Sequence, residues 1–169
     1  MYSGGLRRRL IKDSLAKMID FKLDALGWYA TDSWFTPVTF IDEPLLPADK
    51  VPENSVSLAF ENLYPSEAEL GSLLDRIEWE FFVDIYAEDE SAGIHLSGDV
   101  LDLLQGKFAS LGRTDPSFEV LDFTQDPSPK LFTCSLEELE LSKVRESEYQ
   151  HRKHFFTVGG YVVDYHAGE

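Results

Sequence analysis

The chain has 169 residues, 43% of them hydrophobic and 13% aromatic, which suits one globular domain and excludes a disordered or low-complexity protein. Its 15 Lys and Arg residues against 31 Asp and Glu residues give a formal net charge of −16, which disfavours general binding to nucleic acid or to an anionic membrane. The lone cysteine excludes an internal disulfide. No apolar run of ~20 residues predicts a membrane span, and no signal-peptide core is present, so we expect synthesis in a reducing cytoplasm.

An amphipathic helix is predicted over residues 5–27. Its apolar residues recur at intervals of three and four and form a stripe that needs a surface to pack on. They are Leu6, Leu10, Ile11, Leu15, Met18, Ile19, Leu23 and Leu26. Gly27 is expected to end the helix, because glycine readily adopts the left-handed conformation found at helix ends.

Four basic residues, Arg7, Arg8, Arg9 and Lys12, crowd the first turns of this helix, where the helix dipole disfavours positive charge. Residues 1–27 carry six basic and three acidic residues, a net charge of +3, whereas residues 28–169 carry a net charge of −19. We therefore predict that the four side chains bind an acidic surface on an adjacent copy of the chain, which would build a ring or a stack. The alternative is a solvated helix end that increases solubility.

Residues 28–54 form an extended, proline-rich segment without sustained periodicity, with prolines at positions 37, 44, 47 and 52. The segment is also rich in large apolar side chains, among them Trp34 and Phe35. A structureless stretch of this length is unusual inside a compact domain and is often functional. We predict that it covers the core of its own domain or lies across a neighbouring subunit as an arm. In the second case Trp34 and Phe35 would bind the partner.

Alternating polar and apolar residues predict strands over residues 55–64 and 77–87, joined as a hairpin by a long connection. A helix from about Asp89 to Gly106 follows, and Gly93 and Gly98 within it indicate close packing or a later helix start.

Three further strands are predicted over residues 117–123, about 133–146, and 154–165. Gly159 and Gly160 predict a bulge or a hairpin turn in the last of them. The order of elements predicts a single α+β domain over residues 1–169. We expect a twisted sheet, mixed or mostly antiparallel, with the two helices on one face.

The sequence offers no catalytic motif, since it lacks both the G-x-S-x-G nucleophile motif and the glycine-rich phosphate-binding motifs. Glu78 and Glu80 share one strand face, which we interpret as a solvated or subunit-facing surface. His151 and His154 have an H-x-x-H spacing, but the basic residues between them argue against a metal site. Cys134 is interpreted as a small, half-buried core residue. We therefore predict no enzymatic activity, no metal and no cofactor.

Five short stretches of the sequence carry a resemblance to a known protein family. They are ELGS at residues 69–72, WEFFVDIYAE at 79–88, GIHLSGDV at 93–100, LQG at 104–106 and YVVDY at 161–165. These stretches resemble the tail terminator proteins of long-tailed, siphovirus-type phages that infect actinobacteria. The resemblance is dense over residues 69–107. The proline-rich segment that follows the first predicted helix is also consistent with this family.

The resemblance implies an α+β subunit that assembles, usually as a hexamer, into a ring on the head-proximal end of the tail tube. There the ring stops tube polymerisation and provides the surface that joins the tail to the head. The expected partners are other copies of the chain, the major tail tube protein and a neck or head-completion protein. Genome DNA would pass through the lumen without specific binding. The family uses no cofactor, and its place is in the virion, at the head–tail junction.

Two other functions are consistent with the sequence. Another neck component, such as a head-closure or tail-completion protein, would share the small size and the formation of rings. A small acidic inhibitor or immunity protein would share the strong negative charge, and it would be a monomer that binds one basic partner.

Overall fold

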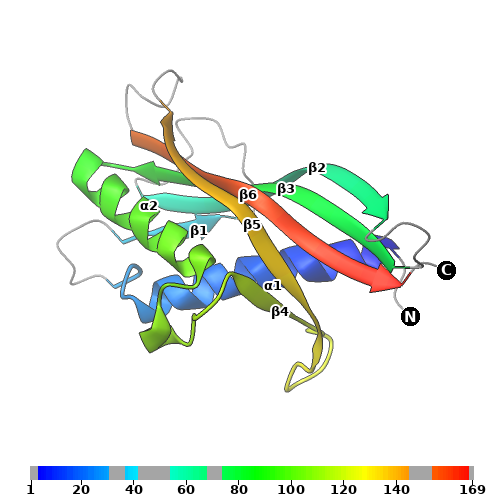
Figure 1. Cartoon of the computed structure of the whole chain (residues 1–169). Helices are drawn as coiled ribbons and strands as arrows, with labels where there is room; N and C mark the ends of the chain where they lie inside the picture. The colour runs from blue at the N-terminus through cyan, green and yellow to red at the C-terminus, as the bar shows by residue number, and fades with distance from the viewer. Residues whose placement is uncertain (1–3, 31–36, 42–53, 68–73, 145–153, 168–169) are drawn as a thin grey trace.

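The computed structural model describes residues 4–30, 37–41, 54–67, 74–144 and 154–167. These residues form two α-helices, a short 3-10 helix and six strands (Figure 1). In chain order they are α1 (Gly4–Ala25), β1 (Thr39–Ile41), β2 (Ser55–Glu67), β3 (Leu74–Ala87), α2 (Glu90–Gln105), η1 (Ala109–Leu111), β4 (Ser117–Leu121), β5 (Lys130–Val144) and β6 (His154–Ala167).

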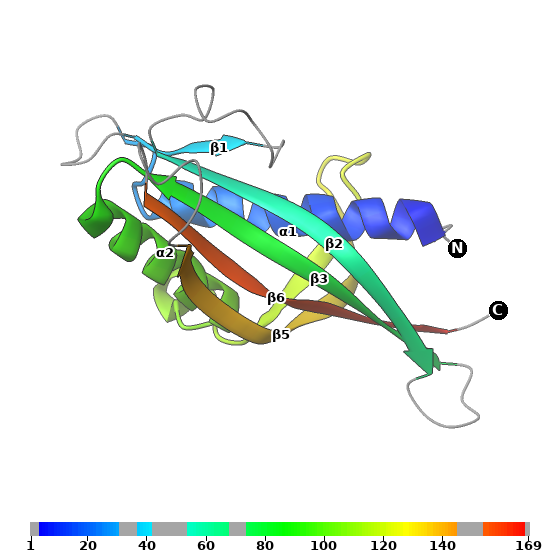
Figure 2. The same cartoon turned by 90° about the horizontal axis from the view of Figure 1, so that it is seen from above.

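The six strands form one curled sheet in the order β1-β2-β3-β6-β5-β4 (Figures 1 and 2). Strand β1 pairs with β2 in parallel, and all other neighbouring strands are antiparallel. Strand β6, the last in the sequence, lies between β3 and β5 in the interior of the sheet. The prediction of a single α+β domain with a mixed sheet is therefore confirmed.

Both helices pack on the inner face of the sheet and share one hydrophobic core with it, as predicted. The strands contribute alternate residues, as expected when one face of each strand is buried. The largest fully buried side chains are Phe81, Ile11, Leu15, Ile19, Leu23, Ile85, Leu96, Leu103 and Leu104. A polar contact adds to this packing on α1: buried Ser14 accepts a hydrogen bond of 3.0 Å from the backbone N–H of Leu121 at the end of edge strand β4.

The predicted helix ends are confirmed. Gly27, just beyond α1, has a φ of 85°, and Gly106 closes α2 with a φ of 74°. The side chain of Asp89 caps the start of α2 by accepting a hydrogen bond of 2.7 Å from the backbone N–H of Ala92. Gly93 stands in a close contact, because a Cβ atom there would lie 2.3 Å from the ring of Phe156. Close packing, and not a later helix start, is thus the reason for a glycine at this position.

Gly159 and Gly160 do not form a turn, because β6 continues through them without a break. They face an irregularity in β5, where the pairing passes from Glu137 opposite Tyr161 to Glu140 opposite Gly159, so that β5 contains one extra residue. Leu139 lies in this bulge and contacts Gly160. A Cβ atom at position 160 would lie 2.8 Å from the Leu139 side chain. The prediction of a bulge in β6 was therefore wrong, since the bulge lies in the neighbouring strand β5.

Other predictions needed correction in detail. Strand β2 continues through Pro65, and β1 lies within the segment for which no regular structure was predicted. A strand of three residues is too short to show an alternating pattern. Trp28 and Val38 belong to the core, so the described residues at these two positions of the segment pack on their own domain. Cys134 is 1% exposed and is thus more deeply buried than the half-buried position predicted.

Candidate partner-binding site

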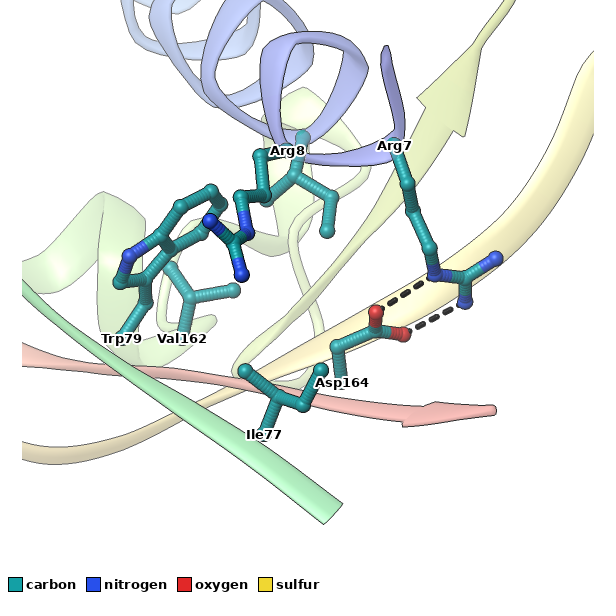
Figure 3. Close-up of a pocket in the computed structure, with 7 residues that line it drawn as sticks. Arg7, Arg8, Ile77, Trp79, Val162 and Asp164 are labelled. Carbon is teal, nitrogen blue, oxygen red and sulfur yellow. Dashed lines mark hydrogen bonds and ion pairs between the residues drawn. The ribbon is translucent and has the colours of Figure 1, made fainter. Parts of the chain in front are cut away.

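The predicted basic cluster lies at one end of the molecule, where the first turns of α1 pass over the ends of β3 and β6 (Figures 1 and 3). The structure divides its four residues into two groups. Arg7 is turned toward the sheet, whereas Arg8, Arg9 and Lys12 are exposed. Trp34 and Phe35, the other predicted partner-binding residues, lie outside the residues that the structure describes.

Arg7 forms a two-bond ion pair with Asp164 of β6. Its Nε donates to Oδ2 of Asp164 at 2.6 Å and its Nη2 donates to Oδ1 at 2.7 Å (Figure 3). The guanidinium also lies 3.6 Å from the centre of the Phe132 ring on β5. The side chains of Arg7 and Asp164 are 18% and 5% exposed. The expectation that all four basic residues lie on the exposed side of the helix was therefore wrong for Arg7, which has a partner within its own chain.

Asp164, the partner of Arg7, was not among the residues predicted for this site. It occupies the same face of β6 as the buried residues Phe156, Val158 and Val162, which places a carboxylate on the apolar side of the strand. A buried charge is costly unless it is paired. The sequence contained this signal, since an Asp two residues after Val162 interrupts an otherwise apolar face, but it did not reveal that the partner comes from the first helix.

The other three basic residues form an exposed positive surface with weak local pairing. Arg9 has a side chain that is 78% exposed and lies 3.6 Å from Asp13, one helical turn further along. Such an exposed pair contributes little to stability. The guanidinium of Arg8 lies 5.8 Å from the centre of the Trp79 ring. These three side chains, unlike Arg7, are exposed at the surface.

An apolar cavity of about 160 Å³ lies beneath this positive surface. Its walls are made by Ile11 of α1, Ile77 and Trp79 of β3, and Val162 of β6, with Arg7, Arg8 and Asp164 at its polar side (Figure 3). Trp79 is held in place by stacking on Phe60 of β2, with ring centres 5.0 Å apart. The cavity is comparable in size to apolar cavities of ~150 Å³ that hold a benzene molecule. Since Arg7 and Asp164 satisfy each other, the cavity suits an apolar group.

The outer face of the sheet is acidic. The Nη2 atom of Arg76 lies 2.6 Å from a carboxylate oxygen of Glu78 and 2.9 Å from one of Glu137, so these two residues share one cation. Glu138 and Glu140 have no ion pair among the described residues. Burial raises the pKa of Asp84, on the same face, from 3.8 to about 6. The molecule thus presents a positive helix end and a negative sheet face to its surroundings.

Other potentially reactive groups are accounted for by packing. Burial raises the pKa of the Cys134 thiol, which makes it a poor nucleophile. Asp99 of α2 accepts a hydrogen bond of 2.8 Å from the Trp28 indole N–H, and His95 lies 4.8 Å from the same ring, so this group fastens the chain after α1 to α2. The described residues contain no group of three or more His, Cys, Asp or Glu that could hold a metal ion. None of the described helices combines the length and the apolar composition that a membrane crossing requires.

Comparison of the sequence with models of known protein families and with curated proteins finds no match.

Proposed function

We propose that this protein is a phage tail terminator. It would assemble into a hexameric ring on the head-proximal end of the tail tube, stop tube polymerisation and provide the surface that joins the tail to the head. Its partners would be other copies of the chain, the major tail tube protein and a neck or head-completion protein. In this role the protein acts through its surfaces, without catalysis or a cofactor, and becomes part of the virion.

The resemblance over residues 69–107 carries the proposal, and the fold adds one supporting observation. The resembling stretch at residues 79–88 contributes most of β3, and GIHLSGDV lies in α2. The separate stretch at residues 161–165 lies in β6, which pairs with β3 so that Trp79 is opposite Val162 and Glu80 is opposite Tyr161. The stretches at residues 79–88 and 161–165, which are distant in the sequence, are therefore neighbours in space.

The distribution of charge also supports a ring. A subunit with a positive helix end and a negative remainder can attract its own kind through unlike surfaces, which is the contact that cyclic assemblies use. Six copies of a chain of net charge −16 carry about −96 formal charges. A ring with this charge would repel DNA in its lumen instead of binding it, which suits a passage for the genome.

The test is a phage in which this gene is deleted, with the lysate imaged by electron microscopy. We expect heads without tails and free tail tubes of excessive length, because nothing would stop polymerisation or join the two parts. Supplying the intact gene from a plasmid should restore joined virions. Normal-length tails attached to heads in the deletion lysate would contradict the assignment. Normal-length free tails beside separate heads would favour a different neck protein.

A further inference from the structure

The two ends of the molecule differ in shape and in charge. The first turns of α1 lie at one end, with the cavity beneath them and Arg7 and Arg8 at its polar side (Figures 1 and 3). Arg9 and Lys12 are exposed on the same turns of the helix. The start of α2 lies at the opposite end of the molecule in both views (Figures 1 and 2). Ile94 projects there from the first turns of α2 and is 57% exposed.

The surroundings of Ile94 are acidic. Glu88, Asp89 and Glu90 are consecutive, and all three are exposed. Lys143 neutralises part of this charge through a contact of 2.9 Å with Glu90. One end of the molecule therefore has an apolar hollow with a positive border, and the other end has an apolar projection with a negative border.

We propose that the cavity beneath α1 receives Ile94 of a second copy of this chain, with Glu88, Asp89 and Glu90 of that copy facing Arg8, Arg9 and Lys12. This inference rests on the ring-forming function proposed above and names the contact by which the ring is built. The occupant is a second copy because the same chain carries both halves of a match in shape and in charge.

The cavity fits the projection in size and chemistry. Its walls are the side chains of Ile11, Ile77, Trp79 and Val162, and its volume of about 160 Å³ suits a branched aliphatic group. The aromatic wall is rigid because Trp79 is stacked on Phe60. A buried apolar side chain that fills a pocket, surrounded by polar contacts that exclude water, is the arrangement that contributes most binding energy in protein interfaces.

The position of the two halves determines how copies associate. Since the hollow and the projection lie at opposite ends, each copy bound through one of them leaves the other free for the next copy. Such head-to-tail contacts do not stop at a dimer, and they close into a ring where the rotation between copies allows it.

Disulfide trapping tests the contact directly. The variant Arg8→Cys/Ile94→Cys places one thiol at each end, too far apart to join within a copy. Buried Cys134, 1% exposed, does not compete. Mild oxidation of the concentrated protein should give a ladder of dimers, trimers and larger species on a non-reducing gel. The matched control is Arg8→Cys/Phe21→Cys, because Phe21 is also a large exposed apolar residue, 65% exposed, but lies further along α1. It should remain mostly monomeric.

The outcomes separate this inference from the proposed function. A ladder no stronger than that of the control, or one that stops at dimers, would overturn the inference even if the wild-type protein caps tail tubes. A clear ladder from a protein that caps no tail tubes would support the proposed contact between copies and contradict the proposed tail-terminator function. In a second measurement by sedimentation, Ile94→Asp should weaken association by roughly 10- to 100-fold, because its charge would have to enter an apolar cavity, whereas Phe21→Asp should leave association unchanged. Equal effects of the two substitutions would also contradict the contact.

Discussion

Arg7 and Asp164, 157 positions apart in the sequence, meet in a two-bond ion pair that ties the first turns of α1 to the central strand β6. Asp164 lies on the inner face of that strand and is nearly buried, so its charge depends on the arginine above it. The pair fixes the position of the helix end. It therefore also fixes where the exposed residues Arg8, Arg9 and Lys12 are presented.

Replacing Arg7→Ala should lower the free energy of unfolding by about 2–4 kcal/mol, because removal of one partner leaves the other charge buried without compensation. Urea unfolding followed by circular dichroism measures the change. Arg9→Ala is the control: its side chain is 78% exposed, and the expected loss is within ~0.5 kcal/mol. Equal losses in the two variants would show that the ion pair with Asp164 does not stabilise the fold.

Two glycines of α2 should respond to alanine in opposite directions. At Gly93 a Cβ atom would lie 2.3 Å from the Phe156 ring, so Gly93→Ala should destabilise the protein by about 1–3 kcal/mol through overpacking. At Gly98 nothing lies within 4 Å of the added atom, so Gly98→Ala should stabilise it by up to ~1 kcal/mol through higher helix propensity. Thermal unfolding of both variants checks the pair. Stabilisation by both substitutions would show that the Phe156 side chain can move away from the added methyl group with little loss of free energy.

Asp84 should make stability fall as the pH rises. Burial raises its pKa from 3.8 to about 6, so the folded state takes up a proton that the unfolded state releases. The contribution of the neutral carboxyl to the free energy of unfolding is fully present below pH 3.8. It is lost as the pH rises to about 6. Above that range Asp84→Asn should be more stable than the wild type by about 1–3 kcal/mol. Urea unfolding of both proteins at pH 4 and pH 7 measures the difference, which should nearly vanish at the lower pH. A difference that does not change with pH would exclude titration of this carboxyl.

The exposed basic residues should matter for assembly and not for folding. The variant Arg8→Ser/Arg9→Ser/Lys12→Ser keeps Arg7 and changes the net charge from −16 to −19. We expect an unchanged circular dichroism spectrum, since exposed substitutions usually cost within ~0.5 kcal/mol. Capping of tail tubes should be impaired, because attraction between copies is lost and repulsion increases. Recovery in high salt would attribute the defect to general repulsion, and persistence would attribute it to specific pairs. Full capping activity would identify the cluster as a solvated helix end.

Long periodic patterns in the sequence predicted most of the fold. The stripe from Leu6 to Leu26 predicted α1, and the alternation over residues 77–87 predicted β3, because each pattern repeats often enough to distinguish a helix from a strand. The three residues of β1 are too few for any period. The sequence also could not show that β6 lies between β3 and β5, since the pairing of distant strands depends on packing of the whole domain.

The candidate site was predicted in part. Charge alone placed Arg7, Arg8, Arg9 and Lys12 together on one helix end, but it could not distinguish the one that turns inward. Helical periodicity separates Arg7 from Arg8 by about 100°, so adjacent residues can face the sheet and the solvent. The cavity beneath them was not predictable, because its walls come from three elements that meet only in the folded domain.

The place of β6 in the sheet has a consequence for the synthesis of the protein. Strands β1, β2 and β3 are made early and β4 and β5 later, yet within the sheet β6 lies between the two groups and pairs with both β3 and β5. While the ribosome is still translating β5, the edge of β3 that will receive β6 is without its partner, and α1 lacks the Asp164 carboxylate that holds Arg7. The domain can therefore close only after residues 154–167 have left the ribosome. Until then the open strand edges are exposed to pairing with other chains.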